Sequence, residues 1–509
     1  MTTVTPSTSA STDFAELTIA QFHAMLRDGT LTSRALTQWY LDRIAAHNTA
    51  GAAVNAVVTV NPAALADAVA LDDSFAAMGE FVGPLHGVPV LVKDQAETAG
   101  LRTTFGSKLF ADYVPDTDAT LIRRLREAGA VILAKTTMCD FAAGWFSSSS
   151  LTGHTRNVYD SARDSGGSSA GSGAGLSANF GLVAVGEDTG GSIRIPASFN
   201  NVYGFRVTTG LISRAGFSPL VHFQDTPGPM ARTAVDLARL LDALVGYDPA
   251  DPFTVVAATS TGVGGYSDAL EAGATAADQP SWRVGVLETG FGPDSDPRMA
   301  PVNEVVRAAI ARMRELGVGV VPGLEIERLG EWIADTSVYL RQSKSDITRF
   351  LSGRDAPVGS FDELYATGVF HPLNDLIDGI ATGPDTVSGD AEYQRLRLNQ
   401  EEFRRLVLGL FADAGVDFLV YPSVQVVAPT HAELEAGTYT ALTFPTNTVI
   451  GSQAGLPALS IPVGFTTDGL AVGMELLGTP FAERSMLQFA AAWEEAAPFR
   501  KEPFLESPR

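Results

Sequence analysis

The most informative stretch of the sequence is residues 164–208, which read DSGGSSAGSGAGLSANFGLVAVGEDTGGSIRIPASFNNVYGFRVT. It contains two Gly-Gly-Ser steps, at residues 166–168 and 190–192. Between them, residues 181–186 alternate small and apolar side chains, which predicts a short buried strand. Glycine lets a backbone turn sharply and approach a ligand closely, at an entropic cost. Two such turns, each carrying a serine, indicate that two hydroxyl groups meet at one site.

The composition describes an acidic globular chain. Hydrophobic residues make up 45% of the 509 residues, which is typical of a chain with a large core. Lys and Arg number 35 against 58 Asp and Glu, so the formal net charge is −23. A charge this negative argues against nucleic acid and against an anionic membrane surface as partners. The expected partner is a small-molecule substrate, and the expected assembly is a monomer or homodimer.

Cysteine and histidine indicate neither a disulfide nor a metal. Cys139 is the one cysteine, so no disulfide can form within the chain. The seven histidines are scattered, and none has the sequence spacing of a zinc motif, so we predict no metal and no cofactor. Residues 1–12 are rich in Ser and Thr and predict a disordered tail rather than a secretory signal. Without a long apolar run, a cytoplasmic protein is expected.

Helical and strand patterns alternate along the chain. Residues 118–128 predict a helix and 131–134 a strand, and residues 301–316 followed by 317–321 repeat the order. This alternation favours an α/β fold with several parallel strands. Residues 88–92 predict a strand that places Lys93 at its end, where an α/β fold often builds its site. Residues 247–279 predict loops, and residues 324–399 show only helical patches.

Three motifs occur in a specific order. Residues 87–94 read GVPVLVKD and residues 188–196 read DTGGSIRIP, on either side of the first Gly-Gly-Ser step. Lys93 lies 75 residues before Ser168, and Ser192 lies 24 residues after it. In motif order and spacing, the chain resembles the amidase signature family over about residues 17–495. Residues 135–142 and 226–233 are similar to two further stretches of that family.

The resemblance implies one α/β/α layered domain around a large mixed β-sheet, here residues 13–509. In this family, residues 324–399 correspond to the most variable part, which shapes the entrance for the substrate. The implied activity is an amidohydrolase that cleaves linear amide bonds, with ester or carbamate bonds as further substrates.

A serine is a weak nucleophile unless a base takes its proton. Lys93 follows a mostly apolar run, which predicts burial, and burial lowers the pKa of a lysine toward the range of a working base. The neighbouring Asp94 should point to the opposite face of the strand.

The resemblance assigns the individual roles. Ser192 is the implied nucleophile, Ser168 the proton bridge, and Lys93 the general base, with a cis peptide between Gly167 and Ser168. Ser168 and Ala142 are the implied substrate-binding residues. The implied oxyanion hole consists of backbone N–H groups of Thr189, Gly190, Gly191 and Ser192. The supporting residues are Ser169, Asp188 and Arg194, the last two as a pair that fixes the turn.

Two positions depart from the family pattern: Ala170 replaces a glycine and Gln95 an asparagine. Neither lies on the implied proton path. The main alternative is the glutaminase subunit of a tRNA-dependent amidotransferase complex, which belongs to the same family. A binding protein without activity is a third hypothesis, and the complete Ser-Ser-Lys set argues against it.

Overall fold

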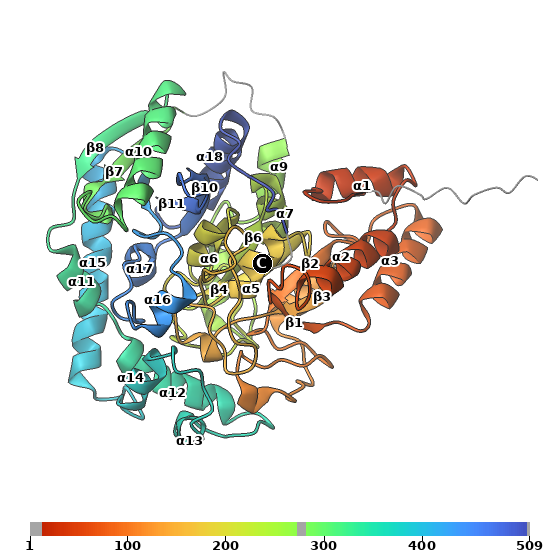
Figure 1. Cartoon of the computed structure of the whole chain (residues 1–509), viewed down its shortest axis with the longest axis horizontal. Helices are drawn as coiled ribbons and strands as arrows, with labels where there is room; N and C mark the ends of the chain where they lie inside the picture. The colour runs from red at the N-terminus through yellow and green to blue at the C-terminus, as the bar shows by residue number, and fades with distance from the viewer. Residues whose placement is uncertain (1–12, 272–280, 506–509) are drawn as a thin grey trace, which may run out of the picture.

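The computed structural model describes residues 13–271 and 281–505, so the tail expected at residues 1–12 lies outside the described residues. The described chain forms one mixed sheet of eleven strands with helices around it (Figure 1). This arrangement confirms the predicted α/β layered fold.

The strands in chain order are β1 Val57–Val60, β2 Pro89–Lys93, β3 Val131–Thr136, β4 Val183–Asp188, β5 Tyr203–Arg206, β6 Thr226–Ala231, β7 Arg283–Leu287, β8 Gly319–Leu324, β9 Phe418–Pro422, β10 Ala458–Phe465 and β11 Ala471–Leu477. Their order in the sheet is β1-β3-β2-β4-β6-β5-β10-β11-β9-β7-β8. β2 pairs in parallel with β3 and β4, and β7 pairs in parallel with β8 and β9. The remaining ladders are antiparallel, so the sheet has two parallel parts joined by an antiparallel centre.

The helices are α1 Ile19–Arg27, α2 Ser33–His47, α3 Ala64–Met78, α4 Thr120–Glu127, α5 Ala170–Ser177, α6 Arg194–Phe199, α7 Ala234–Leu244, α8 Val255–Thr259, α9 Tyr266–Glu271, α10 Ala300–Glu315, α11 Leu329–Asp335, α12 Tyr339–Leu351, α13 Phe361–Ala366, α14 Leu376–Ala381, α15 Ala391–Ala414, α16 His431–Glu435, α17 Thr448–Gln453 and α18 Glu483–Ala496. Thr18 caps α1, where its hydroxyl accepts a hydrogen bond from the Gln21 N–H.

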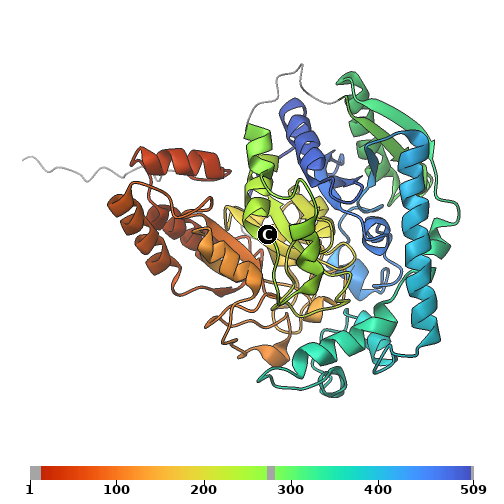
Figure 2. The same ribbon diagram turned by 180° about the vertical axis from the view of Figure 1, so that it is seen from behind.

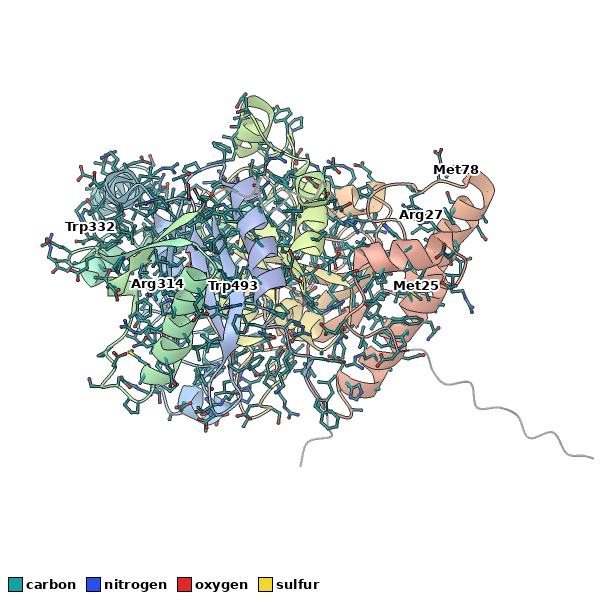
Figure 3. The ribbon with its side chains drawn as sticks, turned by 90° about the horizontal axis from the view of Figure 1, so that it is seen from above. Met25, Arg27, Met78, Arg314, Trp332 and Trp493 are labelled. Carbon is teal, nitrogen blue, oxygen red and sulfur yellow. The ribbon has the colours of Figure 1, made fainter. Side chains whose placement is uncertain are left out.

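The helices fall into groups by position. α5 packs on β2, β3, β4 and β6, and α6 packs on β5, β10 and β11, in the middle of the sheet. Figure 2 shows the molecule from behind, and α7 packs on β4, β5 and β6. α12, α13 and α14 lie together at the lower edge of Figure 1. Seen from above, Met25 and Arg27 of α1 lie at one end of the molecule and Trp332 of α11 at the other (Figure 3).

Strand β2 brings Lys93 into the interior. All five of its residues are buried, because helices or neighbouring strands cover both faces. Leu91 and Lys93 are two residues apart and share a face, the face on which α5 lies. The Leu91 side chain packs against Gly175 of α5 and Gly181, where an added methyl group would lie 3.2 and 2.6 Å from Leu91 carbons. The absence of a side chain at Gly175 lets the helix approach β2 closely.

Three segments differ from the sequence predictions. Residues 247–271 contain α8 and α9 where loops were predicted, and residues 272–280 lie outside the described chain. α15 is one continuous helix, Ala391–Ala414, whose first turns lie in residues 324–399, where only helical patches were predicted. β6 is a strand although Pro227 and Pro229 argue against one. These prolines are two residues apart, so both missing N–H groups face the same neighbouring strand.

Within residues 13–271 and 281–505, no helix combines the length and the apolar character needed to cross a bilayer.

The packing of α5 on β2 can be tested by removing the side chain between them. We expect Leu91→Ala to lower the free energy of unfolding by about 2–5 kcal/mol, because it leaves a cavity in the core. The measurement is urea denaturation at neutral pH. Leu398→Ala is the matched control, since Leu398 on α15 is 69% exposed, and it should change stability by less than about 0.5 kcal/mol. Equal effects would contradict the packing.

Candidate active site

The base and the first serine predicted from the sequence are in contact. Lys93 ends β2, and Ser168 lies just before α5. The Lys93 Nζ donates to Ser168 Oγ at 2.9 Å and to the backbone carbonyl of Glu187 at 3.0 Å. All three residues are fully buried. The fold therefore closes the 75-residue separation between lysine and serine into a direct hydrogen bond.

The second serine lies on the turn between β4 and α6. Its backbone carbonyl accepts a hydrogen bond from the Ser169 N–H at 3.1 Å, so the two Gly-Gly-Ser turns are bonded to each other. The peptide between Gly167 and Ser168 is cis, as the resemblance implies. Ser192 is 1% exposed, which places its hydroxyl in the interior beside the Ser168 turn.

The turn before Ser192 has room only for glycine. A methyl group at Gly190 would lie 2.2 Å from the Tyr339 hydroxyl, and one at Gly191 would lie 2.0 Å from the Thr448 hydroxyl. Gly191 also has a φ of 148°, which other residues rarely adopt. The Thr448 hydroxyl donates to the Gly190 carbonyl at 2.8 Å and so fixes the orientation of the peptide between Gly190 and Gly191.

The N–H groups of this turn remain available. Among residues 13–271 and 281–505, none of the N–H groups of Gly190, Gly191 and Ser192 donates to a protein acceptor. Buried N–H groups are normally paired. Unpaired backbone donors in a buried turn are the kind of group that stabilises an oxyanion.

A buried ion cluster holds the turn in place. Asp188 ends β4 and accepts from Arg194 at 3.0 and 3.1 Å, which is the pair expected from the sequence. Arg206 of β5 adds a contact to Asp188 at 3.2 Å, and Glu475 of β11 contacts Arg194. Burial by itself raises the pKa of Asp188, but the two guanidinium groups outweigh it and lower this pKa to about 2. Asp188 is therefore a carboxylate at any working pH. Sequence reasoning missed Arg206 and Glu475, because neither belongs to a motif.

Ser169 connects the two turns through β4. Its hydroxyl donates to the Glu187 carbonyl and accepts from the Glu187 N–H, both at 3.2 Å. Ala142 lies in the short 3₁₀ helix Asp140–Ala142 with a φ of 59°, and its carbonyl accepts from Gly144 at 3.0 Å. The hydrogen bonds of the described chain do not join Ala142 to either Ser168 or Ser192.

The charge of Lys93 depends on its surroundings. Burial lowers the pKa of Lys93, and the carboxyl group of Glu187 opposes this effect. Asp94, its neighbour in sequence, faces away from it and pairs with Lys135 at 3.4 Å, as strand alternation predicts. Glu187 is a further site residue that sequence reasoning missed, since a single glutamate within a strand carries no recognisable pattern.

A pocket of about 440 Å³ lies on the other side of Trp145 and Tyr339 from Gly190, and Lys93, Ser168 and Ser192 are not among its lining residues. It is lined by Trp145, Gly330, Ile333, Ala334, Ser337, Tyr339, Leu340, Arg341, Glu392, Arg395, Leu396, Ala441, Leu442, Phe444, Thr446, Val449 and Gln453. Trp145 and Tyr339 are also the side chains that a methyl group at Gly190 would strike. More than half of the lining residues come from residues 324–399, the segment expected to shape the entrance.

One histidine cluster lies near the Ser168 turn. His154, Asp164 and His431 bring their ligand atoms within 4.8 Å of one another. The two imidazole rings are stacked with an angle of 29° between their planes, so one ion cannot lie in the plane of both rings. Asp164 already accepts from Ser147 and Gly166. We assign no metal to this cluster, which supports the loop before Ser168.

Comparison with known proteins agrees with this geometry. The family model described as Amidase matches residues 35–487. The chain is 34% identical to a glutamyl-tRNA(Gln) amidotransferase subunit of Moorella thermoacetica, over 95% of this chain and 97% of that protein.

Solved structures show the same similarity. The peptide amidase of Stenotrophomonas maltophilia superposes with a TM-score of 0.84 at 33% identity, covering 97% of this chain and 99% of that one. The corresponding glutamyl-tRNA(Gln) amidotransferase subunit of Thermotoga maritima superposes with a TM-score of 0.74 at 26% identity, covering 97% and 99%. By family model, sequence and fold, the chain belongs to the amidase signature family.

Proposed function

We propose that this protein is a serine amidohydrolase that cleaves linear amide bonds through an acyl-enzyme on Ser192. The observation that carries the proposal is the hydrogen bond between Lys93 and Ser168, on a turn that is itself bonded to the Ser192 turn. The hydrogen bond between Lys93 and Ser168 supplies one step of the proposed proton path, and the step between Ser168 and Ser192 is proposed from the contact of their two turns. A buried neutral lysine is a competent base, since burial favours its uncharged form.

In the proposed reaction the Ser192 oxygen attacks the amide carbon. Its proton passes to Ser168, whose own proton passes to Lys93. The negative oxygen of the tetrahedral intermediate is stabilised by the free N–H groups of the glycine turn, with Thr189 as the first member of the set. The proton then returns through Ser168 to the leaving nitrogen, and the amine departs. Water repeats the sequence on the acyl-enzyme, and the same route serves ester and carbamate bonds.

The adjoining pocket supports an apolar substrate. Trp145, Tyr339 and Phe444 supply aromatic walls near the turn. The charged side chains at the rim are already paired, Arg341 with Asp390 and Arg395 with Glu392. A pocket that recognised free glutamine would need unpaired charges for its ammonium and carboxylate groups. We therefore favour a stand-alone amidase, as a monomer or homodimer, over a glutaminase subunit of an amidotransferase complex, although curated relatives carry the latter name.

The nucleophile can be tested with a fluorophosphonate probe. We expect one covalent adduct on the wild-type protein and none on Ser192→Ala, because only an activated serine attacks the phosphorus. Lys93→Ala should slow labelling by about 100-fold or more. The measurement is the intact mass over time. Ser172→Ala is the matched control, since Ser172 lies on α5 but bonds to the Val185 carbonyl, and it should still be labelled. An adduct on Ser192→Ala would refute the assignment.

The substrate class can be tested with a panel of amides. We expect the purified protein to hydrolyse linear amides with apolar substituents and to release no ammonia from glutamine. Leu442, which lines the pocket and is 60% exposed, gives a specific variant. Leu442→Asp should lower kcat/KM for an apolar amide about tenfold, since it removes apolar contact at the pocket.

The control for this variant is Leu398→Asp, which places the same charge on a surface outside the pocket. It should leave kcat/KM unchanged. Glutamine hydrolysis that appears only after addition of partner subunits would contradict the stand-alone enzyme and favour the glutaminase.

A further inference from the structure

Glu187 is a buried carboxyl group at the proposed base that no motif predicts. It is the last residue but one of β4, and its side chain reaches the amine of Lys93. The side chains of both residues are 1% exposed or less. The inference below rests on the proposed function, because it concerns how Lys93 serves as its base.

The contact between these groups is longer than that of a tight ion pair. Glu187 Oε2 lies 3.5 Å from Lys93 Nζ. The same nitrogen lies closer to Ser168 Oγ, at 2.9 Å, and to the Glu187 carbonyl, at 3.0 Å. A charged lysine and carboxylate usually approach to about 2.7–2.9 Å. The amine is therefore held mainly by neutral oxygen atoms.

The other oxygen of the carboxyl group faces a threonine. The Thr189 hydroxyl lies 3.3 Å from Glu187 Oε1 and 2.6 Å from Asp225 Oδ1. A hydroxyl has one hydrogen, and the shorter contact assigns it to Asp225. The Thr189 oxygen then presents a lone pair to Glu187, which suits a protonated carboxyl group. Asp225 also accepts from the N–H groups of Leu220 and Val221, and these bonds favour its carboxylate form against burial, which raises its pKa.

The remaining neighbours of Glu187 and Lys93 do not change the preference of Glu187 for its protonated form. Asp188 faces Glu187 from the same strand but is paired with Arg194 and Arg206. Gln95, a neutral amide, also faces Glu187. Cys139 faces Lys93 and stays neutral, because burial raises the pKa of its thiol. Asp225 is faced in turn by Asp346 and Arg214.

Burial favours the uncharged form of both partners. It lowers the pKa of Lys93 and, helped by the charge of Asp225, raises the pKa of Glu187 to about 7. The pair has two forms that hold one shared proton: a neutral amine beside a neutral acid, and an ammonium beside a carboxylate. Both forms have zero net charge. Moving one proton between the two side chains converts one form into the other, with no other bond made or broken.

We propose that Lys93 and Glu187 share one proton, which makes Glu187 a positioning residue that sets the charge of the general base. The proton passes between Lys93 Nζ and the Glu187 carboxyl group, where it lies on Oε1 and is donated to the Thr189 oxygen, and the pair titrates as one unit. At low pH the pair gains a second proton and Lys93 is charged. Across the intermediate range the fraction of neutral Lys93 is independent of pH, because the two one-proton forms have equal charge. At high pH the last proton leaves and all Lys93 is neutral.

The proposal predicts a two-step pH profile. The rate of fluorophosphonate labelling of the wild-type protein, followed by intact mass from about pH 5 to pH 10, should rise twice with a plateau between. Glu187→Gln cannot hold the shared proton, so its profile should contain a single rise. Glu187→Asp restores an ionisable group and should bring back two rises. Glu483→Gln removes a buried carboxyl group elsewhere, on α18, and should keep the wild-type profile.

A second variant covers the case in which Glu187→Gln does not fold, as judged by thermal denaturation. Thr189→Val removes the hydroxyl that accepts from the neutral acid. It should lower the first plateau about fivefold relative to the second, because one hydrogen bond to the neutral form is lost. Thr189→Ser retains the hydroxyl and should retain the wild-type ratio. A Thr189→Val profile identical to the wild type would overturn the proposal.

The outcomes separate this inference from the proposed function. A wild-type protein that is not labelled at any pH overturns the proposed function and the inference with it. Normal labelling with one identical rise in the wild type and in Glu187→Gln overturns the inference alone. A folded Glu187→Gln protein that is unlabelled at every pH also overturns it, because the carboxyl group would then do more than share a proton.

Discussion

The buried contact between Asp188 and its two arginines is the constraint on which the site depends. Asp188 ends β4, and Arg194 begins α6 across the turn that carries Ser192. Arg206 and Glu475 bring β5 and β11 into the same cluster. Removing one member of a buried ion cluster leaves an uncompensated charge, which typically costs about 3–5 kcal/mol. The turn therefore cannot relax without loss of stability, and the ion cluster holds its backbone in place without help from a substrate.

Much of the site could be predicted from the sequence because its parts are local. The glycines of the Ser192 turn, the Asp188–Arg194 pair and Lys93 at a strand end all lie within short motifs, and the structure places them together. Glu187 and Asp225 could not be predicted in this way. Their carboxyl groups meet only through Thr189, after β4 and the loop before β6 have come together in the fold.

Helix α5 could not be predicted from the sequence, and the reason is physical. Residues 170–177 read AGSGAGLS, which has no apolar periodicity, and glycine weakens a helix. α5 forms because its small residues fit a site with no room for others: a methyl group at Gly171 would lie 2.1 Å from the Ala56 carbonyl, and one at Gly173 would lie 2.9 Å from Pro196. Tertiary packing overrides helix propensity there, and that packing holds Ser168 against Lys93.

The pocket and the proposed oxyanion turn share two walls, and this links specificity to catalysis. Tyr339 begins α12, and its hydroxyl lies where a methyl group at Gly190 would be; Trp145 closes the same space from the loop before Ser168. Gln224 bonds both to the Tyr339 hydroxyl, at 3.2 Å, and to the Thr189 carbonyl, at 2.6 Å. A change in residues 324–399 that moves α12 therefore alters the shape of the pocket and the support of the turn together. This segment can tune the substrate only within the limits that the Ser192 turn sets.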